Sequence, residues 1–82
     1  MNTKKITPIL RYVVNLEARL SCWDGNAVHW QNELTTLQKQ IEELMKLTSQ
    51  EKEGAKRSLL GFLELRARQC KNCILTRTGM KN

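Results

Sequence analysis

The sequence has few of the residues that interrupt helices, with one proline and four glycines among 82 residues. No apolar run approaches the roughly 18 to 20 residues that a membrane-spanning helix needs, and the amino-terminal stretch lacks the apolar core of a signal peptide. These absences argue against a disordered chain rich in proline and glycine. They also predict a protein without a membrane span, located in the cytoplasm.

Cysteine is present only three times, an odd number that favours reduced thiols over a disulfide framework. A chain of this length is expected to form a single domain, 1–82, that hides only roughly 60% of the surface of the unfolded chain. Its core must be thin. We therefore expect it to associate with itself or with a partner.

Apolar residues recur at alternating spacings of three and four in three segments, which is the pattern of helices that pack in a bundle. The three rows are Ile9, Val13, Leu16, Leu20 and Trp23; Ala27, Trp30, Leu34, Leu37, Ile41 and Leu44; and Leu60, Leu63, Ala67, Cys70 and Ile74, the last widened by Leu59 and Phe62. The rows predict an all-α fold with helices at about 8–23, 27–47 and 50–75 and a frayed tail at 76–82.

Capping residues set the predicted limits of the first two helices. Thr7 followed by Pro8 is typical of a helix start, because Pro at the first helical position loses no needed donor. Gly25 is expected to end the first helix, and Asn26 to cap the second. Such a short connection predicts an antiparallel helical hairpin.

The apolar pattern stops between the second and third rows. In residues 48–58, Ala55 is the only apolar residue apart from Gly54. Thr48 and Glu51 have the spacing of a capping box, and Gly54 inside a helix costs about 1 kcal/mol. The third row also does not continue the phase of the second, which favours a turn and a three-helix bundle. A long kinked helix is the alternative.

No set of residues in the sequence indicates catalysis. Glu42 and Glu43 are neighbours on the predicted second helix and so point about 100° apart, which suits surface charge better than a carboxylate pair. His29 stands alone beside Trp30, and there is no glycine-rich phosphate loop. We predict that the chain is not an enzyme.

One group of residues suits a metal ion. Cys70 and Cys73 lie one helical turn apart, and an up-down-up bundle would bring them to the level of Cys22 and His29 at one end. A zinc ion held by these four residues would stabilise a small domain. However, a single CxxC pair is a weak signal, and Cys70 already falls on the apolar row. The prediction is no cofactor, with zinc as the alternative.

The net charge of +6 is confined to the last third of the chain. Residues 1–53 carry seven basic and seven acidic side chains, whereas residues 54–82 carry seven basic side chains and Glu64 alone. Arg57, Arg68 and Lys71 fall within about 60° of one another on a helix, so they can share a face. The predicted contact surface comprises Lys56, Arg57, Leu59, Phe62, Leu63, Arg66, Arg68 and Lys71.

A basic amphipathic helix suits three kinds of partner. It can dock on an acidic protein surface, neutralise nucleic-acid phosphates, or lie on an anionic membrane. Nucleic-acid binding has little support from aromatic residues, because the third helix has only Phe62, at an expected core position. Membrane binding is less favoured, because the neutral hairpin already offers the apolar stripe a place to bury. We therefore predict a non-catalytic helical adaptor or modulator that binds protein: a chaperone-like cofactor, a subunit, or a mobile-element inhibitor of a host nucleic-acid enzyme. Direct, largely sequence-independent DNA or RNA binding is the alternative.

Overall fold

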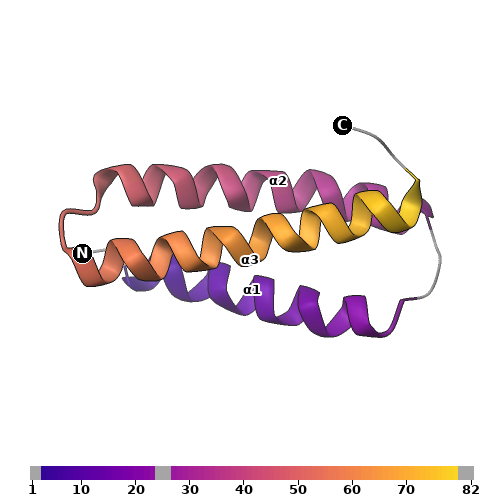
Figure 1. Cartoon of the computed structure of the whole chain (residues 1–82), viewed down its shortest axis with the longest axis horizontal. Helices are drawn as coiled ribbons and strands as arrows, with labels where there is room; N and C mark the ends of the chain where they lie inside the picture. Colours follow the sequence, from indigo (N-terminus) through magenta and orange to yellow (C-terminus); the bar gives the residue numbers. More distant parts are fainter. Residues whose placement is uncertain (1–2, 24–26, 80–82) are drawn as a thin grey trace.

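Three helices form an elongated bundle of 40 × 23 × 16 Å (Figure 1). The computed structural model describes residues 3–23 and 27–79. Its helices are α1 (Thr3–Ser21), α2 (Ala27–Gln50) and α3 (Gly54–Thr78), and the described residues contain no strand. The all-α prediction is confirmed, and the three-helix bundle is observed rather than the long kinked helix.

The helices run up, down and up, so that α2 is antiparallel to both neighbours and α3 is parallel to α1 (Figure 1). The most extensive packing is between α2 and α3, followed by that between α1 and α3. The predicted hairpin of α1 and α2 is antiparallel, but these two helices touch each other least. The third helix therefore holds the bundle together. The predicted roles of Gly25 and Asn26 lie outside the described residues.

The start of α1 differs from the prediction. The helix begins at Thr3, so Pro8 lies in its interior and not at its first position. The earlier start buries Ile6, which is 6% exposed. Pro8 itself is exposed, so water can reach the Lys4 carbonyl that proline leaves without a donor. Burial of an apolar side chain thus offsets one missing hydrogen bond.

The break between the second and third helices is short. Residues 51–53 connect α2 to α3, so the break lies within residues 48–58, where the apolar pattern stops, and α2 ends at Gln50 and α3 begins at Gly54 rather than at the predicted 47 and 50. No capping box forms, because the Thr48 hydroxyl donates to the Leu44 carbonyl within α2. Gly54 instead becomes the first residue of α3, and Glu53 caps it with an extended backbone. At the other end, α3 continues to Thr78, beyond the predicted limit at 75. Gly79 ends it in the left-handed conformation (φ 74°).

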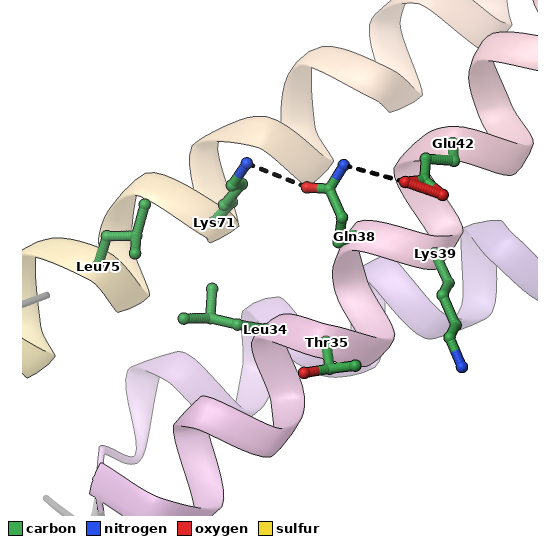
Figure 2. A pocket seen from close by; sticks show the side chains of 7 residues that line it. All are labelled: Leu34, Thr35, Gln38, Lys39, Glu42, Lys71 and Leu75. Atoms are coloured by element: carbon green, nitrogen blue, oxygen red, sulfur yellow. Dashed lines mark hydrogen bonds between the residues drawn. The ribbon is translucent and has the colours of Figure 1, made fainter. Parts of the chain in front are cut away.

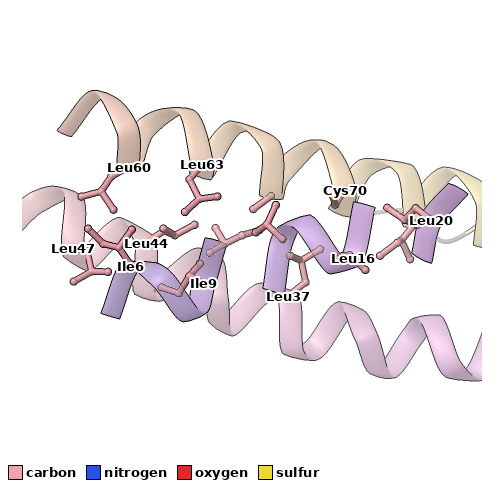
Figure 3. Packing of buried hydrophobic residues seen from close by; sticks show 14 of the residues in the cluster. Ile6, Ile9, Leu16, Leu20, Leu37, Leu44, Leu47, Leu60, Leu63 and Cys70 are labelled. Carbon is pink, nitrogen blue, oxygen red and sulfur yellow. The ribbon is translucent and has the colours of Figure 1, made fainter. Parts of the chain in front are cut away.

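The core follows the predicted rows closely (Figure 3). All five residues of the third row are buried, and the first two rows gain Ile6 and Leu47. Trp23 and Leu34 lie at the edge of the core and are half-buried, and the side chain of Ala27 is not among those described. No polar or charged side chain among the described residues is buried. Apolar burial between the three rows is therefore what specifies the bundle.

Candidate functional site

The predicted contact surface points in three directions around α3. Leu63 is 1% exposed and belongs to the core, so it cannot contact a partner, and we remove it from the surface. Apart from Lys56, the remaining residues divide between the flank of α3 beside α2 and the flank beside α1. The predicted single face is therefore two faces, and each needs a separate description.

The flank beside α2 carries Arg57, Arg68 and Lys71. Lys71 Nζ donates to Gln38 Oε1 at 3.0 Å, and Arg68 Nη2 lies 3.6 Å from the sulfur of Met45, also on α2. These contacts fix the direction of the flank. Arg57 is exposed and shares the flank, since 57, 68 and 71 fall within about 60° of one another.

A groove lies between α2 and α3 along this flank (Figure 2). Its volume is about 490 Å³. The half-buried side chains Leu34 of α2 and Leu75 of α3 supply its apolar surface. Its polar lining comprises Thr35, Gln38, Lys39, Glu42 and Lys71. Figure 2 shows Lys71 donating to Gln38 and Gln38 donating to Glu42, so a cation, an amide and a carboxylate connect across it.

The charge of the basic flank is only partly neutralised within the chain. Arg68 Nε pairs with Glu64 Oε2 at 3.1 Å on the same helix. Lys71 has a neutral amide as its partner, and the described residues provide no ion pair for Arg57. Lys71, in the groove, and Arg57, about 21 Å before it along the same flank of α3, therefore keep an uncompensated charge.

The flank beside α1 carries Leu59, Phe62 and Arg66. Arg66 donates two hydrogen bonds to the carboxylate of Glu17 on α1, and its guanidinium carbon lies 5.6 Å from the centre of the Phe62 ring. The bond to Glu17 raises the pKa of Arg66 further. Phe62 is 57% exposed, so its predicted core position is wrong, and Leu59 is exposed with it. Both stand at the edge of the row rather than inside it.

Lys56 lies in the first turn of α3, apart from both flanks. Its Nζ pairs with Glu53 Oε2 at 3.1 Å, next to the connection between α2 and α3. Three of the five predicted contact cations, Lys56, Arg66 and Arg68, thus have carboxylate partners within the chain. The cationic surface is smaller than the charge count alone indicates.

A polar network joins α1 to α2. Tyr12 donates to Glu33 Oε2, and Arg19 Nη1 donates to Glu33 Oε1 at 2.5 Å. Burial by itself raises the pKa of Glu33, but the bonds from Arg19 and Tyr12 outweigh it and hold that pKa below its usual range. Burial, together with the bond to Glu33, raises the pKa of Tyr12. This network replaces apolar contacts where α1 and α2 pack least.

Aromatic side chains gather where α1 ends and α2 begins. The Trp23 and Trp30 rings stack with centroids 4.5 Å apart, and His29 meets Trp30 edge-on at 5.2 Å. Arg77 lies 5.2 Å from the Trp23 ring centre and donates to the Leu20 carbonyl at 2.6 Å. His29 therefore contacts an aromatic ring.

The two neighbouring glutamates on α2 differ in position. Glu42 lines the groove, and Glu43, the next residue, is half-buried.

The four residues of the alternative zinc site are in different environments. Cys22 is exposed, Cys73 is half-buried, and Cys70 is buried in the core. Burial, with the charge of Glu17, raises the pKa of the Cys70 thiol to about 11. Within residues 3–23 and 27–79, no three side chains of His, Cys, Asp or Glu come together as a metal site.

Several surface residues were not predicted. Leu10 and Val14 on α1 and Leu65 on α3 are exposed apolar side chains, and Leu75 contributes to the groove. A signal for the first two exists in the sequence. They follow Ile9 and Val13 by one residue each, and so form a second apolar row at a spacing of four.

Comparison with known proteins gives no relative: no protein-family model, curated protein or solved structure matches the chain. None of the helices in the described part of the chain combines the length and apolar character needed to cross a bilayer.

Proposed function

We propose that the chain is a non-catalytic cytoplasmic adaptor or modulator that docks an acidic, partly apolar protein segment along the groove between α2 and α3. One observation carries this proposal: Arg57, Arg68 and Lys71 share the flank of α3 that borders the groove of Leu34 and Leu75. A groove with apolar walls suits insertion of an aliphatic side chain, and the row of cations suits carboxylates next to it.

The composition of the groove favours protein over nucleic acid. None of the residues that line it is aromatic, so it offers no platform on which a base can stack. Three of the five cations predicted as contacts are already paired with carboxylates, which reduces the number of phosphates that the surface can neutralise. Direct DNA or RNA binding is the second candidate, and the uncompensated charges of Arg57 and Lys71 are what support it.

The test is reversal of two cations on the flank that borders the groove, Arg68→Glu with Lys71→Glu. Tagged protein retrieves partners from a nuclease-treated lysate of the source cells. We expect the double variant to retrieve at least about tenfold less of the specific partner, because charges at the edge of an interface control association. Folding should persist, since exposed charges contribute little to stability. Lys4→Glu with Lys5→Glu is the matched control, because it makes the same change in charge on exposed residues of α1.

Fluorescence anisotropy with random duplex DNA and with single-stranded RNA separates the two candidates. If the groove docks protein, the parent should bind both nucleic-acid probes only weakly. The Arg68→Glu/Lys71→Glu variant and the Lys4→Glu/Lys5→Glu control should then reduce that weak binding by similar amounts. A loss of affinity that is linear in log salt, together with retrieval that disappears after nuclease treatment, would instead establish nucleic-acid binding. Equal retrieval by the parent protein and both variants would refute the groove as a contact surface.

A further inference from the structure

A second face of the bundle is apolar rather than basic. Seven large apolar side chains are exposed in the described part of the chain, and five of them lie on α1 and α3. We call these five the α1/α3 patch: Leu10, Val14, Leu59, Phe62 and Leu65. They are between 37% and 57% exposed. Exposed apolar clusters of this kind are typical of interaction sites.

Helical geometry places these residues together. Leu10, Val14 and Glu17 fall within about 60° on α1, as do Leu59, Phe62 and Arg66 on α3, at about 100° per residue. The ion pair of Glu17 with Arg66 shows that these two flanks face the same side of the bundle. Leu65 lies about 60° from Phe62 and about 60° from Arg68, on the outer face of α3 at the margin of this flank. The patch therefore spans the junction of two parallel helices.

The ion pair beside the patch adds no net charge to it. Glu17 and Arg66 form one ion pair, and Arg66 also covers Phe62. Arg77, farther along the same flank, is held by the Leu20 carbonyl and the Trp23 ring. Arg11 lies about 100° round α1 from Leu10, which puts it at the edge of the patch. The face thus offers an apolar centre with little net charge.

We propose that the α1/α3 patch binds a second copy of this chain, forming a two-fold symmetric dimer. Each copy carries a net charge of +6, so two copies repel unless they meet at a face with little charge. The basic flank beside α2 does not satisfy that condition, whereas the patch does. A two-fold interface brings one surface against itself, which suits an apolar face whose neighbouring ion pair, Glu17 with Arg66, carries no net charge.

A charged partner fits this face less well. An acidic segment would need, at the centre of the face, a cation without a carboxylate partner. The cation there, Arg66, forms an ion pair with Glu17. The dimer leaves the groove between α2 and α3 outside the interface, because the groove lies on the opposite flank of α3. The dimer is therefore independent of the proposed adaptor function, and each can fail without the other.

Analytical ultracentrifugation of the full chain tests the dimer. We expect the parent protein to change from monomer to dimer as its concentration rises through the micromolar range. Phe62→Glu should weaken the dimer at least about tenfold, because it removes an aromatic residue from the centre of the interface. Leu10→Glu, on the other helix of the patch, should have the same direction of effect. Circular dichroism measures whether each variant keeps its helices. We expect both variants to do so, because both side chains are outside the core.

Val28→Glu is the matched control, since it adds the same charge at an apolar residue that is 68% exposed and lies on α2. It should leave the dimer unchanged, and so should Arg68→Glu with Lys71→Glu. A parent protein that stays monomeric at the highest concentration would overturn the proposal. So would a dimer that tolerates both Phe62→Glu and Leu10→Glu.

Discussion

At the scale of single residues, Glu33 links two helices that otherwise pack little. It accepts hydrogen bonds from Tyr12 and Arg19, both on α1, while it stands on α2 itself. Its side chain is only 9% exposed. Because a carboxylate in this position needs its donors, the three residues behave as a unit and not as separate contacts.

Replacing this carboxylate tests the network. Glu33→Gln should lower the free energy of unfolding by about 1 to 3 kcal/mol at pH 7, the usual range for losing hydrogen bonds to a charged group. Because the pKa of Glu33 is lowered by folding, its contribution is present above the unfolded pKa and is lost as pH falls through the folded one. Denaturant unfolding at pH 7 and at pH 3 measures both effects, and the difference between variant and parent should shrink at the lower pH.

Glu42→Gln is the control for this measurement, since Glu42 is exposed and accepts only a long bond of 3.5 Å from Gln38. It should change stability by less than about 0.5 kcal/mol. A Glu33→Gln protein as stable as the parent at pH 7 would show that the network contributes nothing to the packing of α1 on α2.

At the scale of the helix, the middle of α2 is the most sensitive segment of the core. Leu37 is 0% and Ile41 2% exposed, and both face α1 and α3. Leu37→Ala and Ile41→Ala should each lower the free energy of unfolding by about 2 to 5 kcal/mol, through lost burial and the cavity left behind. Thermal and denaturant unfolding measure this. Met45→Ala, on the exposed side of α2, should cost much less, and three equal values would mean that the row is not the core.

The rows of apolar residues predict most of this architecture. The row of Leu60, Leu63 and Ile74 is buried as expected, because a row at spacings of three and four can only face one direction on a helix. Residues next to a row are harder to predict. Leu59 and Phe62 flank the third row. Whether such residues are covered depends on the distance to the neighbouring helix, and the spacing of apolar residues in the sequence gives no information about that distance.

The candidate surfaces were predicted less well for the same reason. The sequence places Arg57, Arg68 and Lys71 together, but it does not say which flank of α3 meets α1. The pairing of Arg66 with Glu17 joins residues that are 49 positions apart, so no local pattern reveals it. The start of α1 was also missed, because the turn before Pro8 forms only when Ile6 can reach the core.

At the scale of the whole molecule, one apolar core joins the three helices. Cys70, which belongs to the alternative zinc site, is buried, and burial raises the pKa of its thiol to about 11, so losing the thiol proton to a metal ion costs more here than at an exposed cysteine. Metal ligation requires the thiolate. We expect a strong chelator to leave the melting temperature unchanged. Loss of stoichiometric zinc with a fall in melting temperature would contradict this, and Cys22→Ser would then show whether the exposed thiol takes part.

The odd number of helices gives the molecule a polarity along its long axis. Thr3 and Thr78 lie at opposite ends of a bundle that is 40 Å long (Figure 1). A domain or label joined before α1 therefore meets the bundle at the opposite end of its 40 Å long axis from one joined after α3. With two helices, the same attachments would lie side by side. The groove and the α1/α3 patch lie along the bundle between these two ends.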